Sequence, residues 1–94
     1  MKYCRTTLIS YRSEQDADEL ISTYQANAAA DFPDAELLLC TRTGPTSAVM
    51  TSLYSTKNAA DQAMAARKPI LQTAKGESKI KRIETHQGEA FKLD

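Results

Sequence analysis

Apolar and polar residues alternate along four stretches of this chain, and each stretch predicts a strand. Residues 3–11 are rich in Tyr, Thr, Leu and Ile, which favour a pleated, half-buried surface. Residues 36–55 hold two more such runs, which a tight turn divides at a Gly-Pro pair. A last strand is expected over residues 78–87. Ile80 and Ile83 have opposite parity there, so either a bulge separates them or Ile80 belongs to the loop.

Residues 13–30 have the pattern of an amphipathic helix that lies on a sheet. The Ser13 hydroxyl can cap the first turn by accepting from the amide three residues on. Apolar residues recur at helical spacing and form one stripe, made of Ala17, Leu20, Ile21, Tyr24 and Ala28. Pro33 disfavours helical angles at Phe32, so the helix is expected to end near Ala30.

A second helix is predicted after the paired strands. Its start can be capped by Ser55 or by Thr56. Its apolar stripe contains Ala60, Ala63, Met64 and Arg67. Pro69 removes a backbone donor, so the helix either ends there or kinks and continues to a stop at Lys75 and Gly76.

The turn also predicts the register of the two central strands. With Gly44 and Pro45 at its centre, Cys40 faces Val49. One face then carries Leu38, Cys40, Val49 and Leu53, and the other carries Leu37, Leu39, Thr41, Ala48, Met50, Ser52 and Tyr54. Both faces hold apolar side chains, whereas an antiparallel sheet in a lone small domain usually has one solvated face. We therefore expect something besides the helices to cover the second face.

Length and charge narrow the classes of protein. A chain of 94 residues predicts a single domain over residues 1–94, near the lower limit for a self-sufficient core, so a partner subunit would help. Twelve basic and twelve acidic residues cancel, so no net charge attracts nucleic acid or an anionic membrane. No stretch approaches the ~20 apolar residues that span a bilayer, and the N-terminus lacks a secretion signal. We expect a cytoplasmic protein.

Three local features agree with these expectations. A basic cluster at the start of the last strand, formed by Lys75, Lys79, Lys81 and Arg82, lacks the paired aromatic residues that bind RNA on similar sheets, so a solvated edge is favoured. Cys4 and Cys40 lie in separate strands, and two reduced thiols are expected rather than a disulfide. No ligand-spaced pair of Cys or His residues indicates a metal site.

The element order is strand, helix, strand, strand, helix, strand, the ferredoxin-like βαββαβ arrangement of the α+β class. That order, the long central hairpin, the two apolar sheet faces and the ending Gly-Glu-Ala-Phe at residues 88–91 together resemble the dimeric α+β barrel superfamily, and most of all its antibiotic biosynthesis monooxygenase family. The resemblance implies a four-stranded antiparallel sheet with two helices on one face. It also implies a homodimer through the other face and a pocket between sheet and helices.

The dimeric α+β barrel superfamily contains a haem-degrading branch and a cofactor-free branch. The residues of this chain can be compared with those that the haem-degrading branch uses. The haem-degrading branch uses a His on the second helix, with a Trp and an Asn; residues 57–74 here contain no His, and the chain has no Trp. The cofactor-free branch oxidises phenolic substrates with oxygen and needs no signature residues, so the sequence does not test this activity. One function that the resemblance implies is that of a cofactor-free monooxygenase-like enzyme acting on a small aromatic or apolar substrate. The alternative is a non-catalytic homodimer that binds a small ligand or regulates.

His86 and Tyr54 are the candidate catalytic residues. The imidazole of His86, the single histidine, can act as a general base near neutral pH; otherwise it is simply solvated. The Tyr54 hydroxyl can orient a phenolic or carboxylate ligand in an apolar pocket; otherwise Tyr54 is a core residue. A nucleophilic pair of Cys40 with His86 is a further alternative.

Arg42, together with Tyr54, is the candidate substrate-binding residue. A half-buried guanidinium on a strand can clamp an anionic substrate, and Arg5 shares this property. Otherwise both arginines reach solvent or pair with Glu36 or Glu84.

Overall fold

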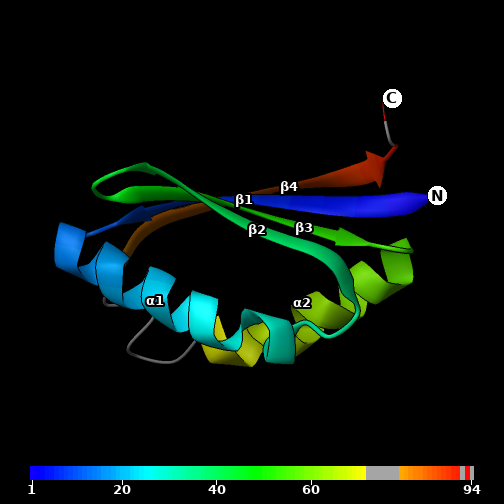
Figure 1. Cartoon of the computed structure of the whole chain (residues 1–94), viewed down its shortest axis with the longest axis horizontal. Coiled ribbons are helices and arrows are strands. Elements are labelled where there is room, and N and C mark those ends of the chain that lie inside the picture. Colours follow the sequence, from blue (N-terminus) through cyan, green and yellow to red (C-terminus); the bar gives the residue numbers. More distant parts are fainter. Residues whose placement is uncertain (72–78, 92, 94) are drawn as a thin grey trace.

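A computed structural model of the chain describes residues 1–71, 79–91 and 93. The elements are β1 (Lys2–Tyr11), α1 (Glu14–Asp31), β2 (Ala35–Gly44), β3 (Ser47–Tyr54), α2 (Lys57–Leu71) and β4 (Ile80–Ala90) (Figure 1). This order confirms the predicted ferredoxin-like βαββαβ arrangement.

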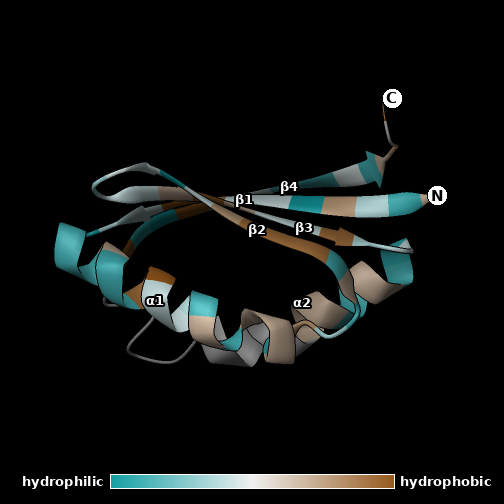
Figure 2. Ribbon diagram, in the orientation of Figure 1, coloured by the Kyte–Doolittle hydropathy of each residue, from teal (hydrophilic) through white to brown (hydrophobic). Residues whose placement is uncertain are grey.

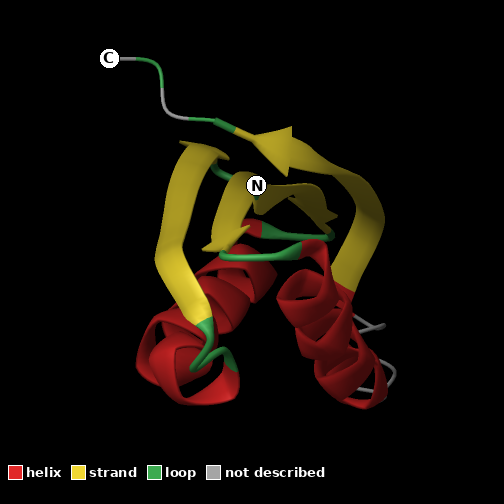
Figure 3. Ribbon diagram, turned by 90° about the vertical axis from the view of Figure 1, so that its right-hand side faces the viewer, coloured by secondary structure: helices red, strands yellow, loops and turns green. Residues whose placement is uncertain are grey.

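The strands form one antiparallel sheet in the order β2-β3-β1-β4. Both helices lie on the same face of this sheet and leave the other face open (Figure 3). We call these the helix-side face and the outer face. The α+β fold with two helices on one face is therefore confirmed.

The helix starts follow from side-chain caps. The Ser13 hydroxyl accepts from the Asp16 amide at 3.0 Å, as predicted. At α2 the Thr56 hydroxyl accepts from the Ala59 amide at 3.1 Å, so Thr56 and not Ser55 is the residue that caps α2. Each cap satisfies an amide that has no partner inside the helix.

The second helix and the last strand settle two alternatives that the sequence left open. The helical backbone of α2 passes Pro69 and runs to Leu71. The stop expected at residues 75 and 76 lies outside the described residues. Strand β4 starts at Ile80, and its pairing with β1 shifts between Ser10 and Tyr11. That shift is the bulge that opposite parities at Ile80 and Ile83 require.

The predicted register of the hairpin is wrong by one residue. Cys40 pairs with Met50 rather than with Val49. The loop consists of residues 45 and 46 because Gly44 pairs with Ser47, and a further shift between Arg42 and Gly44 adds a residue on β2. A one-residue slip moves a strand's side chains to the opposite face of its partner. The helix-side face of the hairpin therefore holds Leu38, Cys40, Ala48, Met50, Ser52 and Tyr54, and the outer face holds Leu37, Leu39, Thr41, Val49, Thr51 and Leu53.

The core lies between the helix-side face and the helices. Its buried members are Ile9, Tyr11, Ala17, Ala48 and Met50, and Leu20, Ile21, Tyr24, Cys40 and Ile80 pack against them. Figure 2 shows a hydrophobic stretch along the middle of β2, whose residues alternate between the two faces. On the outer face Leu8, Leu37 and Leu39 are 39%, 47% and 52% exposed. None of the helices within the described ranges is long and apolar enough to cross a membrane.

Candidate functional site

A small cavity lies on the helix-side face, where β1 and β3 meet the end of α1. Its walls are formed by Arg5, Thr7, Tyr24, Phe32, Met50, Thr51, Ser52 and Tyr54. The cavity has a volume of about 10 Å³, which is room for about one water molecule. The cavity is thus narrow, and it combines aromatic and polar walls.

Arg5 supplies the positive charge of the cavity. Its side chain is buried, with the residue only 5% exposed. Its Nε and Nη2 both donate to the Gln87 Oε1, at 3.2 and 3.0 Å, and Nη2 also donates to the Ala60 carbonyl at 3.4 Å. Gln87 faces Arg5 across the β1–β4 pair, and Ala60 lies in the first turn of α2. These contacts hold the guanidinium in one orientation at the centre of the sheet.

Neutral polar groups surround Arg5 on the same face. Ser52 pairs with Arg5 across β1 and β3, and Thr7 follows two residues along β1, where it is buried. Because side chains two residues apart on a strand share a face, Thr7 and Ser52 lie on the same face as Arg5, and all three line the cavity. A ligand here would meet hydroxyl groups and a cation together.

Three aromatic residues close the cavity from two sides. Tyr54, at the end of β3, is 1% exposed. Tyr24 belongs to α1, and buried Phe32 follows the last turn of that helix. The Phe32 amide donates to the Ala28 carbonyl at 2.8 Å, and Pro33 ends the helix after it, which places Phe32 among the residues that line the cavity. Such walls suit an aromatic ring.

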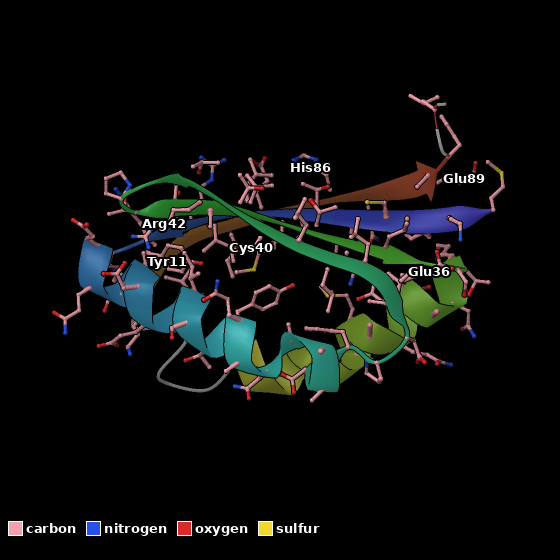
Figure 4. All side chains as sticks on the ribbon, in the orientation of Figure 1. Tyr11, Glu36, Cys40, Arg42, His86 and Glu89 are labelled. Carbon is pink, nitrogen blue, oxygen red and sulfur yellow. The ribbon has the colours of Figure 1, made fainter. Side chains whose placement is uncertain are left out.

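The structure places the three predicted site residues in three different surroundings. Tyr54 lines the cavity. His86 lies on the outer face of β4, 66% exposed by its side chain, with its Nε2 3.6 Å from the Glu84 Oε1. Figure 4 shows His86 on the side of the sheet that faces away from the helices. Tyr54 and His86 therefore lie on opposite faces of one subunit's sheet.

Arg42 lies at the hairpin end of β2, outside the cavity. Its Nη1 donates to the Asp18 Oδ1 at 2.6 Å, and its Nε and Nη2 donate to the carbonyls of Gly44 and Pro45. The guanidinium thereby joins the turn to α1 (Figure 4). These contacts explain a structural role for Arg42, while a substrate-binding role stays a prediction.

The two cysteines are free thiols on opposite faces of the sheet. Cys4 pairs with Leu53 on the outer face, and Cys40 pairs with Met50 on the helix-side face. Burial raises the pKa of the Cys40 thiol, and the nearby Arg42 charge offsets this in part. A raised pKa leaves less of the nucleophilic thiolate at neutral pH. Cys40 and His86 also lie on opposite faces, and the described residues contain no cluster of three metal-ligating side chains.

Sequence reasoning named Tyr54 but missed the neighbours that make the cavity. Thr7 and Ser52 were assigned to strands, Tyr24 to the apolar stripe of a helix and Phe32 to the segment after that helix, and Arg5 was considered only beside Arg42. One signal was available, because Arg5 shares its parity with Ile9 and Tyr11, which have to face the helices if the strand is to contribute to a core. Charge at such a position is unusual and marks a site.

No known protein family matches the sequence, and no curated protein matches it either. Solved structures do match over nearly the whole chain. A protein of Chloroflexus aurantiacus assigned to the antibiotic biosynthesis monooxygenases is 14% identical, with a TM-score of 0.76, over 100% of this chain and 97% of its own. A dimeric ferredoxin-like protein from an uncultured marine organism is 12% identical, with a TM-score of 0.79, over 98% of each chain.

SnoaB, a cofactor-independent oxygenase from Streptomyces nogalater, is 14% identical, with a TM-score of 0.66, over 98% of this chain and 95% of its own. Identities this low show a common fold and leave the activity undetermined. The chain therefore has the ferredoxin-like fold found in dimeric ferredoxin-like proteins and in antibiotic biosynthesis monooxygenases.

Proposed function

We propose that this protein is a homodimer that binds a small aromatic molecule beside Arg5 and oxidises it with molecular oxygen, without a cofactor. One observation carries the proposal: a buried cation and two hydroxyl-bearing residues converge with three aromatic residues around a single cavity. A fold shared with SnoaB, which is a cofactor-independent oxygenase, supports the reaction class.

The outer face supports the homodimer. Leu8, Leu37 and Leu39 leave large side chains partly exposed on strands that form the centre and one edge of the sheet. A second copy packed on this face would remove them from water, and each Å² of apolar surface buried contributes roughly 25 cal/mol. A fold shared with proteins described as dimeric ferredoxin-like supports the same assembly. A cytoplasmic location, expected from the sequence, belongs to this proposal.

The chemistry assigned to the site is the oxidation of a phenol to a quinone. One oxygen atom of O2 becomes a carbonyl on a ring carbon that carried hydrogen. The other atom leaves as water with two hydrogens taken from the substrate. Arg5 would favour the electron-rich phenolate, because a nearby positive charge lowers the pKa of a phenol. The Tyr54 hydroxyl would orient the ring. Neither His86 nor Arg42 has a part in this proposal.

Oxygen uptake with 1-naphthol or 2,6-dimethylphenol, each of which has a ring carbon that carries hydrogen opposite its hydroxyl group, tests the reaction. We expect uptake to follow quinone formation mole for mole and to fall at least about tenfold in Tyr54→Phe. His86→Gln is the matched control, since its side chain lies on the outer face, and it should leave the rate unchanged. Uptake no faster than in protein-free buffer, with either phenol, would contradict the reaction.

A non-catalytic homodimer that binds a small ligand or regulates is the second candidate. The narrowness of the cavity favours this second candidate, because a volume of about 10 Å³ leaves little room for a substrate together with the oxygen that would react with it. Saturable binding of either phenol without oxygen uptake would select this candidate.

A further inference from the structure

We infer that the cavity beside Arg5 selects an anionic ring compound, an aromatic carboxylate, over its neutral counterpart. This inference rests on the proposed small-molecule site and adds to it the charge of the ligand. It requires no oxidation, so it can hold or fail separately from the reaction.

Arg5 is buried at the centre of the sheet. Arg5 lies in a row of four residues across the sheet, with Leu38 and Ser52 to one side and Gln87 to the other. A guanidinium stays charged at any physiological pH, and burying its charge away from water is costly. A charge held at this depth strengthens any hydrogen bond to an anion that reaches it, because water screens it little.

Hydrogen bonds to Gln87 fix the orientation of the Arg5 guanidinium. Both contacts to Gln87 are made to one oxygen atom, Oε1, through Nε and Nη2. They fix the plane of the guanidinium, and Arg5 lines the same cavity as Thr7, Ser52 and Tyr54. A hydrogen bond from a guanidinium to an ionised carboxylate is stronger than one to a neutral amide oxygen, so the charge of the ligand decides the preference. Hydroxyl groups of the walls can donate to the same carboxylate.

The aromatic walls select the rest of the ligand. Tyr24, Phe32 and Tyr54 supply ring surface next to the charge. The present space, about 10 Å³, suits a small polar group more than a ring. A bound ring would therefore occupy volume that the Phe32 side chain now fills. Phe32 is the residue best placed to yield, because it follows the last turn of α1 and is not inside the sheet.

Binding of benzoate and benzamide to the full-length protein tests the selection. The two compounds have nearly the same shape and differ in charge. Followed by amide chemical shifts in NMR titrations, benzoate should shift the signals of Arg5, Ser52 and Gln87 and bind at least about tenfold more tightly than benzamide. Equal affinities, or benzoate shifts confined to other residues, would overturn the inference.

Three variants separate charge from shape. Arg5→Gln should abolish the preference for benzoate, and Arg12→Gln, which changes an exposed arginine on the same chain, should keep it. Phe32→Ala should strengthen benzoate binding several-fold by opening room for the ring. A preference for benzoate that survives in folded Arg5→Gln would overturn the inference. If Arg5→Gln does not fold, the comparison of benzoate with benzamide on the unmodified protein still decides.

The two proposals fail in different ways. Benzoate binding at Arg5 without oxygen uptake from phenols would remove the reaction and keep the anion site. Oxygen uptake from phenols with equal binding of benzoate and benzamide would keep the reaction and remove the anion preference.

Discussion

The two faces of the sheet are made by the same strands, yet they differ in what covers them. On the helix-side face Ile9, Met50 and Tyr54 are buried by the helices. On the outer face Leu8, Leu37 and Leu39 keep between about two fifths and half of their surface exposed. Hydrophobicity alone does not separate the faces, since both contain large apolar residues. The difference separates a core that one chain completes from a surface that the proposed second copy would cover.

Charge is distributed differently on the two faces as well. On the outer face, Arg82, Glu84 and His86 occupy alternate positions along the edge strand β4. Glu84 pairs there with Leu8 of β1. On the helix-side face the charge of Arg5 is buried at the centre. An edge of charged side chains deters further sheet pairing there. The buried charge at the centre is the one around which the proposed ligand site is built.

The largest expected effect comes from a charge on the outer face. Val49→Asp places a carboxylate between Leu8 and Thr41, its partners on the two neighbouring strands. Burying an ion in an apolar interface costs several kcal/mol, so the dimer should weaken by a factor of at least about 100. Sedimentation velocity should show monomers.

Thr85→Asp is the control for this variant, because Thr85 lies exposed on the helix-side face of β4. It introduces the same group and should remain dimeric. A folded Val49→Asp dimer would mean that the outer face is not the contact.

A pair of alanine substitutions distinguishes the two faces by their concentration dependence. Met50→Ala removes a buried core side chain and should lower the free energy of unfolding by about 2–5 kcal/mol at every protein concentration. Leu39→Ala affects the outer face, so its melting temperature should fall most in dilute samples. Thermal melts at two concentrations, a hundredfold apart, measure both. If the melting temperatures of the two variants depended equally on protein concentration, the two faces would not differ in their contribution to the dimer.

A smaller effect is expected where α1 starts. Ser13→Ala removes the hydroxyl that accepts from the Asp16 amide, which should cost about 1 kcal/mol of stability. Ser22→Ala changes an exposed serine inside the same helix and should be nearly neutral. Urea denaturation measures the difference. A loss in Ser22→Ala as large as in Ser13→Ala would show that the cap contributes nothing specific.

The smallest effect concerns the ion pair that joins α1 to the start of β4. The hydrogen bond from Lys79 lowers the pKa of the Glu19 carboxyl below its model-compound value of 4.5. Because the folded pKa is depressed, the stabilisation is present above pH 4.5 and is lost as pH falls through the folded pKa. Lys79→Met should therefore be slightly less stable than the natural chain at pH 7, and the difference should shrink as the pH falls below 4.5. A difference that stays constant as the pH falls would rule out the ion pair as its cause.

Local chemistry made most of the fold predictable from sequence. The Ser13 cap, the stop before Pro33 and the bulge between Ile80 and Ile83 each follow from rules that act within a few residues. The hairpin register was missed because Gly44 and Pro45 permit two loop positions. The structure places an extra residue on β2 between Arg42 and Gly44, and the Gly-Pro pair alone does not predict it.

The site was less predictable than the fold, for a related reason. Tyr54 was named, but the wrong register grouped it with Leu39 instead of Cys40. Its cavity partners Tyr24 and Phe32 come from another element, and only the tertiary packing brings them to β3. The spacing of residues along a strand or helix predicts which face of that element each residue occupies. It does not predict which residues of a helix will lie against which residues of a strand.

The mass of the unmodified protein in solution tests the contrast between the two faces most directly. Sedimentation equilibrium should give twice the chain mass of 10.4 kDa across micromolar concentrations, since the outer face then lies between two copies. A stable monomer of 10.4 kDa over the same range would contradict the account, because the exposed leucines of the outer face would then have no second copy to cover them.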